Sequence, residues 1–333
     1  MPSLKTKNIL IIFQCFSLVL FSFFNGFSQQ NPGLSFYSFQ TNFQNPASVG
    51  LKEEGSFQVN YRNQWTQYQS TYDGSGNLGT SIASLSLSLK PIPVGLGFMY
   101  LNDLSPSGAG LQFLRAQSAY HLEMGSGIIS LGFSAGLATK SFDGRVFKTR
   151  DPNDPIANEI SGKSIAKSSL DFGAGISYSL NNWTIGAAID HLNSPTFSFT
   201  SSLNGSTNLQ PVFLVHSSYE LPILEKISLY PFLQWRSYQG QNVLDLGMRV
   251  KAFDLFWLGG NFRSNDSLTG MFGLNLLNNS LEFGYALDQN FINQNLKAPL
   301  SHELFLKFKL PDLQLIKKRN NVVPINTPRY KIN

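Results

Sequence analysis

Residues 168–180 read SSLDFGAGISYSL, and this stretch decides the fold class of the chain. Large apolar side chains stand at Leu170, Phe172, Ile176 and Tyr178, and small or polar residues alternate with them. Successive side chains of a β-strand point to opposite faces, so this period of two gives one apolar and one polar face. The stretch is also long enough to cross a bilayer as a tilted strand, which takes roughly 9–11 residues.

The same alternation recurs along most of the chain, and it predicts an all-β fold with about 14 antiparallel strands. Shifts of a few residues at the boundaries leave counts of twelve and sixteen open at this point. The predicted strands are residues 55–66, 80–89, 93–102, 111–122, 127–139, 168–180, 182–192, 209–220, 226–237, 241–252, 255–264, 267–277, 279–288 and 300–310.

The lengths of the connections favour an outer-membrane barrel over a soluble sandwich. Connections after even-numbered strands are short, as at 90–92 and 123–126, whereas several of those after odd-numbered strands are long. Outer-membrane barrels have short periplasmic turns and longer outer loops. A sheet in lipid must also close on itself, because no water pairs with its edges. The sequence therefore predicts a transmembrane β-barrel over 55–310, with both termini periplasmic. The long connections are 67–79, 103–110, 140–167, 193–208 and 289–299.

Residues 1–28 have the features of a signal peptide. Lys5 and Lys7 precede an apolar run over 9–24, and small residues at Gly26 and Ser28 suit cleavage after Ser28. A transmembrane anchor is the alternative, but no basic flank follows the run. The single cysteine, Cys15, lies inside this segment and lacks the small residue that precedes a lipidated cysteine. The mature chain therefore has no thiol for a disulfide, a nucleophile or a metal.

The charge distribution predicts no nucleic-acid partner. Charged residues make up 14% of the chain, against about 25% in typical soluble domains. Without residues 1–28, which hold two lysines, 23 basic and 20 acidic residues remain, a net charge of +3. Residues 311–333 hold five basic residues and one acidic residue, so the barrel itself is about neutral and has no basic stripe. We expect 311–333 to be a basic periplasmic tail.

The polar faces of the predicted strands are rich in Gly, Ser and Ala, and such a barrel has space in its lumen. That space is either a channel or is filled by a plug. Residues 29–54 precede the first strand and are the candidate plug. Aromatic residues near strand ends are predicted to form interfacial girdles, although core aromatics of a soluble sandwich would give a similar pattern. They are Trp65, Tyr100, Trp183, Trp235 and Trp257.

Charged residues also occur on the predicted inner faces, and they have two interpretations. Asp245, Arg249 and Lys251 share one face, and Glu303, Lys307 and Lys309 share another. They line a pore or hold a plug through ion pairs, or they are hydrated residues with no special task. Arg62 lies on the polar face of the first strand. We hypothesise that it pairs with an acidic group of the N-terminal stretch.

No catalytic or metal-binding motif is visible. The four histidines are scattered among strands, without the close spacing that metal sites use. His302 and Glu303 are adjacent in a predicted strand, so they point to opposite faces and cannot act together. The sequence predicts no catalytic residue, no metal ligand and no cofactor.

Several motifs occur in an order that resembles the PorP/SprF family of type IX secretion membrane proteins. An opening Gln29-Gln30 is followed by an Asn-Pro-Ala element with a nearby glycine and by a Tyr-Arg-Asn-Gln-Trp strand, and further matches lie downstream. Ser48-Val49 is a minor departure from the family pattern. The resemblance covers roughly residues 29–310. The family-motif residues are Asn45, Pro46, Ala47, Gly50, Tyr61, Arg62, Asn63, Gln64, Trp65, His191, Asp245, Ser301, His302 and Glu303.

The resemblance implies an accessory barrel of type IX secretion in the outer membrane, reached through the signal peptide. Its expected partners are outer-membrane lipid, other type IX components and secreted cargo, such as large adhesins with a C-terminal sorting domain. The charged outer loop 140–167 is a hypothetical contact for cargo. The alternative function is an outer-membrane channel or transporter for a small or hydrophobic solute. An outer-membrane enzyme is the third hypothesis, which no motif supports.

Overall fold

A computed structural model describes residues 30–51, 55–66, 78–90, 92–105, 108–145, 161–199, 206–264, 266–291 and 298–310. The predicted signal peptide 1–28 and the predicted tail 311–333 lie outside the described residues. The chain divides into two units, Met1–Pro32 and Gly33–Asn333. All the strands that the structure describes belong to the second unit.

Most of the described residues of the second unit lie in strands, and two short helices precede these strands in the part that the structure describes. The helices are α2 (Thr41–Gln44) and the 3-10 turn η1 (Pro46–Ser48). The strands are β1 (Gly55–Gln64), β2 (Leu78–Ser88), β3 (Val94–Leu104), β4 (Ala109–Met124), β5 (Gly127–Asp143), β6 (Ser164–Leu180), β7 (Trp183–Asp190), β8 (Thr196–Ser198), β9 (Ser206–Asn208), β10 (Val212–Tyr219), β11 (Leu221–Leu224), β12 (Ile227–Tyr238), β13 (Gln241–Ala252), β14 (Phe256–Arg263), β15 (Ser267–Leu276), β16 (Leu281–Asn290) and β17 (Leu300–Lys309).

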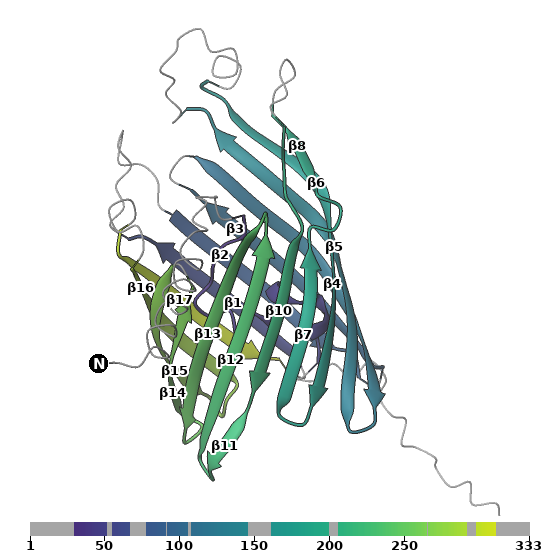
Figure 1. The fold of residues 1–333 in the computed structure, drawn as a ribbon, viewed down its shortest axis with the longest axis vertical. Coiled ribbons are helices and arrows are strands. Elements are labelled where there is room, and N and C mark those ends of the chain that lie inside the picture. Colours follow the sequence, from purple (N-terminus) through teal and green to yellow (C-terminus); the bar gives the residue numbers. More distant parts are fainter. Residues whose placement is uncertain are drawn as a thin grey trace, which may run out of the picture. The chain divides into compact units, whose positions relative to one another are not determined.

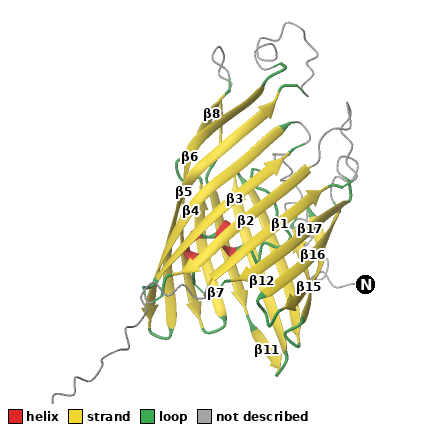
Figure 2. Cartoon of the chain, turned by 180° about the vertical axis from the view of Figure 1, so that it is seen from behind, coloured by secondary structure: helices red, strands yellow, loops and turns green. Residues whose placement is uncertain are grey.

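The sheet closes into a barrel of 14 antiparallel strands, as the alternation predicts. Strands adjacent in sequence pair along most of its circumference, as Figures 1 and 2 show. The first and last strands also pair, from Ser56 opposite Lys309 to Asn63 opposite His302. Pairing of β10 with β12 completes the ring, and β11 continues β10 along β12. Among the described residues, closure gives every strand of the ring a hydrogen-bonded neighbour on both sides over at least part of its length, and lipid requires such pairing.

Two outer connections differ from the prediction. The connection predicted over 140–167 is shorter, because β5 and β6 stay paired as far as Asp143 opposite Ser164. The predicted loop 193–208 contains its own small hairpin, β8 with β9. The added parts of β5 and β6 carry Lys140, Asp143 and Lys167, and β8 and β9 have three residues each. Neither pair of segments has the long outward apolar stripe of a lipid-facing strand. The signal used to find strands therefore stops where the barrel leaves the apolar layer.

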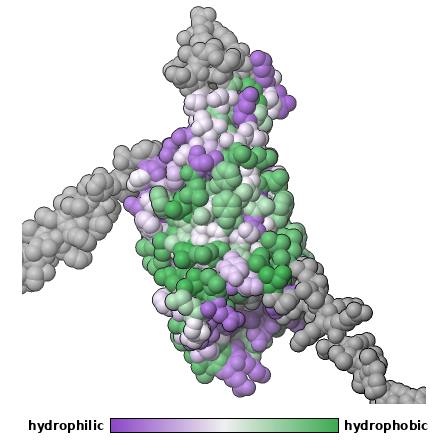
Figure 3. Space-filling model, turned by 90° about the vertical axis from the view of Figure 1, so that its right-hand side faces the viewer, coloured by the Kyte–Doolittle hydropathy of each residue, from purple (hydrophilic) through white to green (hydrophobic). Residues whose placement is uncertain are grey.

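Large apolar side chains cover the outer surface of the strands. In Figure 3 the face in view has green apolar residues along the middle and purple hydrophilic residues towards both ends. Outward side chains with substantial exposure include Leu96, Phe98, Leu131, Phe133, Ile176, Leu258, Phe272 and Leu304. Such a belt suits the acyl chains of a bilayer. Among the described residues, neither helix has the length and apolar character to span a membrane.

Phe272→Arg is expected to lower the free energy of unfolding by about 2–4 kcal/mol, because it places a charge at mid-depth in lipid. Phe272 lies near the middle of β15 and is 46% exposed on the outer face. Leu276→Arg at the end of the same strand is the matched control, with an expected cost of about 0–1 kcal/mol. Urea unfolding in phospholipid vesicles measures both values. Equal costs at the two positions would contradict the proposed membrane depth.

Candidate functional site

The interior of the barrel is occupied by residues 33–51, here called the inner segment. The segment contains α2 and η1, which Figure 2 shows in red, framed by the strands. Its groups hydrogen bond to residues of β2, β4, β6, β12 and β17, which belong to different sides of the barrel. Most of its residues are buried. The candidate site is therefore the contact between the inner segment and the inner faces of the strands.

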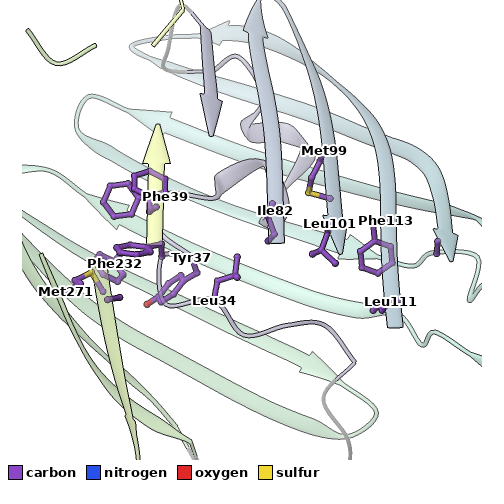
Figure 4. Packing of buried hydrophobic residues seen from close by; sticks show 14 of the residues in the cluster. Leu34, Tyr37, Phe39, Ile82, Met99, Leu101, Leu111, Phe113, Phe232 and Met271 are labelled. Atoms are coloured by element: carbon purple, nitrogen blue, oxygen red, sulfur yellow. The ribbon is translucent and has the colours of Figure 1, made fainter. Parts of the chain in front are cut away.

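Apolar side chains of the inner segment pack against apolar side chains that point inward from the strands. The Phe36 ring centroid lies 5.4 Å from that of Phe305 and 6.1 Å from that of Trp257. Phe39 lies 4.7 Å from Phe305 and 5.2 Å from Trp257. Figure 4 shows Phe39, Tyr37 and other labelled members of this core converging inside the barrel. The lumen at this level is thus an apolar core rather than an aqueous channel.

Trp257 is where the girdle prediction is wrong. Its side chain is 1% exposed and points into the lumen, where it packs against the inner segment. Tyr100, Trp183 and Trp235 are 40%, 41% and 37% exposed, as girdle residues would be. The error arises because Trp257 lies near a strand end, like the other aromatic residues. Its face can be assigned only from its packing partners.

Glu303 attaches the start of the inner segment to β17. Its carboxylate accepts hydrogen bonds from the backbone N–H of Ser35 at 2.7 Å and of Phe36 at 3.2 Å. It also accepts from Asn60 Nδ2 at 2.8 Å and lies 3.2 Å from Nη1 of Arg62. Glu303 is fully buried. A buried carboxylate needs such donors, so Glu303 fixes the backbone of Ser35 and Phe36 against β17.

Arg62 pairs with carboxylates of the barrel wall, which corrects the hypothesis that its acidic partner belongs to the N-terminal stretch. Its Nη1 lies 2.5 Å from Asp288 Oδ2 and 3.2 Å from Glu303 Oε2. The inner segment contributes a hydroxyl instead. Arg62 donates to Ser35 Oγ at 2.6 Å, and Ser35 Oγ donates to Asp288 Oδ1 at 2.7 Å. The described part of the segment has no acidic residue, so a neutral bridge joins it to the two charges.

A second buried charge pair holds the first residues of the inner segment. Arg263 Nε donates to Asp245 Oδ1 at 2.6 Å, and its two terminal nitrogens donate to the carbonyl oxygens of Gly33 and Leu34 at 3.3 and 2.6 Å. Arg236 supplies a further ion pair to Asp245 at 3.1 Å. Asp245 thus positions Arg263, and Arg263 binds the backbone of the segment.

The Asn-Pro-Ala element forms the η1 turn, and this turn binds the barrel wall on the side away from Glu303. Asn45 caps the turn, because its Oδ1 accepts from the N–H of Ala47 at 2.9 Å, and Pro46 occupies the first helical position. The Asn45 amide group donates to the carbonyls of Ile176 and Ala187 at 3.0 and 3.3 Å. Its Nδ2 also lies 3.2 Å from Nε2 of His216. One asparagine side chain therefore accepts the hydrogen bond that caps the turn and also joins the turn to β6, β7 and β10.

Glycines in the wall permit this close approach. A β-carbon at Gly132 on β5 would overlap the backbone of Pro46 and Ala47. Gly50 has a φ of +69°, a conformation that suits glycine, and its Cα faces Gly95 of β3. These contacts give a physical role to the Asn-Pro-Ala element and its nearby glycine, and to the glycine-rich strands that receive them.

His191 belongs to a separate buried cluster on β4, β6 and the end of β7. Arg115 Nη2 pairs with Asp171 at 2.7 Å, and Arg115 Nη1 pairs with Asp190 at 2.9 Å. His191 Nδ1 lies 2.8 Å from the other oxygen of Asp171. The ring of Phe113 lies 4.4 Å below the Arg115 guanidinium carbon. The cluster joins β4 to β6 and the end of β7 across the inner face of β5.

The remaining family-motif residues are not brought into one site. Tyr61 is 47% exposed on the outer face of β1. Asn63 and Gln64 end that strand, and the N–H of Trp65 donates to Ser301 Oγ at 3.1 Å. His302 points outward, where its Nδ1 lies 2.6 Å from the hydroxyl of Tyr285. The two adjacent residues His302 and Glu303 therefore lie on opposite faces of β17.

Several residues that form this site were not predicted from the sequence. Arg115, Asp171 and Asp288 share one signal, a charged residue in the middle part of a strand on its polar face. Such charges in membrane-spanning segments are rare and usually paired. Ser35 and His216 carry no comparable signal. Within the ranges that the structure describes, His, Cys, Asp and Glu side chains form no group of three that could hold a metal.

Comparison with solved structures shows the barrel fold. The toluene transporter TbuX of Ralstonia pickettii is similar, with a TM-score of 0.51 at 12% identity over 80% of this chain and 92% of that chain. The monoaromatic hydrocarbon channel CymD is similar with a TM-score of 0.51 at 11% identity over 82% and 93% of the two chains. At these identities the likeness concerns the fold alone. No curated protein matches the chain.

A protein-family model gives a more specific match than the solved structures do. The model described as type IX secretion system membrane protein PorP/SprF matches residues 26–308, which includes the inner segment and all but the last residue of the barrel strands. The barrel fold and this match together place the protein in the outer membrane. The chain belongs to the PorP/SprF family of type IX secretion system membrane proteins.

Proposed function

We propose that this protein is an accessory barrel of type IX secretion whose lumen is closed by its own inner segment. It supports the secretion or surface display of cargo such as large adhesins with a C-terminal sorting domain. Family membership supports the pathway. The observation that carries the closed lumen is the attachment of the segment to Glu303 on one wall and, through Asn45, to β6, β7 and β10 on the other.

The attachment favours an interaction protein over a transporter. A route through the barrel for a solute would have to pass the Phe36 and Phe39 core and the ion pairs of Arg62 and Arg263. Buried pairs of this kind are costly to break one partner at a time. The alternative function, a channel for a small or hydrophobic solute, requires the inner segment to leave the lumen. No step of the proposed function is catalytic.

The proposed division of the chain follows from this role. Residues 1–28 direct export, 29–54 form the plug, 55–310 form the barrel and 311–333 form a periplasmic tail. Because the plug fills the lumen, contacts with cargo and with other type IX components belong to the rims. The extension of β5 and β6 to Asp143 and Ser164 provides such a rim.

Affinity purification of the tagged protein from its native outer membrane tests the proposal, with mass spectrometry to identify what accompanies it. We expect recovery of a large surface protein with a C-terminal sorting domain, or of secretion-machine subunits. A tagged outer-membrane barrel from another family, purified from the same membrane, is the control. Recovery of the barrel alone in mild detergent, with the control pattern unchanged, would contradict the accessory role.

A further inference from the structure

A cavity of about 340 Å³ lies between the inner segment and the end of the barrel that carries the short turns. Phe39 and Asn42 of the segment form its floor, and Asn182, Glu220 and Lys309 are exposed residues near its rim. Its volume is at the lower end of the roughly 300–1,000 Å³ that ligand pockets occupy. The cavity is therefore open to solution and large enough for one or two side chains of a partner.

The walls of this cavity carry more positive than negative charge. Its cations are Arg249, Lys251, Lys307 and Lys309, from β13 and β17, and its carboxylates are Glu220 and Glu282. Glu220 already accepts a hydrogen bond from the hydroxyl of Tyr230 at 2.6 Å. Asp254, outside the cavity lining, pairs with Lys251 at 2.8 Å. Four cations against three carboxylates still leave an excess of positive charge. In a partly enclosed space, which is screened less than open water, this excess favours an anion as the occupant.

Arg249 is held between aromatic rings, and its side chain is 19% exposed. Its Cζ lies 4.2 Å from the ring centroid of Phe39, 4.7 Å from that of Tyr230 and 5.5 Å from that of Trp257. Aromatic rings cover the faces of the group and fix its plane. The carboxylate nearest to it, Glu282, is 3.9 Å from Nη1, which is outside hydrogen-bonding range. Nε has no hydrogen-bond partner among the described residues.

We propose that this cavity is a binding site for a carboxylate of an acidic peptide that reaches the barrel from the short-turn end. A planar guanidinium whose nearest carboxylate is outside hydrogen-bonding range matches an incoming carboxylate, which accepts two parallel hydrogen bonds from such a group. Lys309 binds a neighbouring acidic side chain of the same peptide, and Lys251 contributes to this contact beside its pair with the exposed Asp254. This site goes beyond the proposed role in secretion and does not rest on it, since it follows from the cavity alone.

Binding of a fluorescein-labelled hexaglutamate peptide to the purified full-length barrel in detergent tests this site by fluorescence anisotropy. Hexaglutamine is the neutral control peptide. Arg249→Met removes the guanidinium and is expected to weaken hexaglutamate binding about tenfold. This is the contribution expected from one charge-assisted hydrogen-bonded pair. Because this change also alters packing on Phe39, the double variant Lys251→Gln with Lys309→Gln is measured beside it, and the same loss is expected. Lys226→Gln is the matched control, since Lys226 is exposed on a turn outside the cavity.

The site is supported if hexaglutamate binds, hexaglutamine does not, and both cavity variants weaken binding while Lys226→Gln leaves it within about twofold. If Lys226→Gln lost as much affinity for hexaglutamate as the cavity variants, the loss would reflect net charge alone, and the proposal would be overturned. So would unchanged binding in Arg249→Met and in the double variant. Inorganic phosphate is added as competitor to separate a carboxylate site from a phosphate site. Displacement by phosphate at the same concentration as unlabelled peptide would overturn the carboxylate assignment.

Discussion

Glu303→Ala is expected to lower the free energy of unfolding by about 3–5 kcal/mol, the usual cost of removing one partner of a buried ion pair. The change leaves Arg62 with Asp288 as its remaining acidic partner. It also removes the acceptor of the backbone N–H groups of Ser35 and Phe36, and unpaired buried donors are costly. Urea titration of the refolded barrel in one detergent, followed by tryptophan fluorescence, measures the loss.

An ion pair on the surface provides the control for Glu303→Ala. Asp143 pairs with Arg145 at 2.7 Å, but the Arg145 side chain is 67% exposed. Surface pairs contribute little because water screens them, so Asp143→Ala should leave the unfolding midpoint where it is. An unchanged midpoint in Glu303→Ala as well would show that the attachment of the inner segment to β17 does not stabilise the barrel.

Gly132→Ala is expected to displace the turn at Pro46–Ser48 from its contact with β5 and to expose the end of the inner segment. The new β-carbon would overlap the backbone of Pro46 and Ala47, and backbone cannot rotate away as a long side chain can. Overpacking of this kind costs about 1–3 kcal/mol. A reporter cysteine at Val49, a residue with no exposed surface, should then react with a water-soluble maleimide about tenfold faster, since about 1.4 kcal/mol corresponds to tenfold. Cys15→Ser removes the chain's own thiol from the assay.

Gly270→Ala is the matched control for Gly132→Ala. A β-carbon at Gly270 on β15 would meet nothing within 4 Å, so the same substitution should leave the labelling rate of the Val49→Cys reporter unchanged. If Gly132→Ala also left that rate unchanged, the close approach of η1 to β5 would not hold the inner segment in place.

The sequence was sufficient for the barrel because one physical rule applies to every strand. A wall between lipid and lumen requires alternation, and residues 168–180 show it without interruption. The same rule does not say which inward positions contact a plug. Phe305 and Trp257 point inward as apolar residues, against the expected polar lining. Their partners, Phe36 and Phe39, are more than 200 positions away in the chain, so no local pattern reports the contact.

Arg62 shows where the site could be predicted and where it could not. An arginine on the polar face of a membrane strand must find acceptors, and that requirement pointed to an ion pair near the inner segment. The identity of the acceptors depends on barrel closure, which pairs β17 with β1 and places β16 one strand further along the wall. Asp288 and Glu303 become neighbours of Arg62 only after the ring is complete. Sequence periodicity predicts the strands and their faces. It does not predict the register in which the first and last strands pair, and that register decides the partners of Arg62.

The most direct test of the sealed lumen is the conductance of the purified full-length protein in planar lipid bilayers. The wild-type barrel is expected to insert without a steady current, because the inner segment and its ion pairs fill the cross-section. A variant lacking residues 33–51, shown to stay folded by its resistance to urea, should conduct steadily. Steady conductance of the wild-type protein at the level of that variant would contradict a sealed lumen and would favour a transport channel.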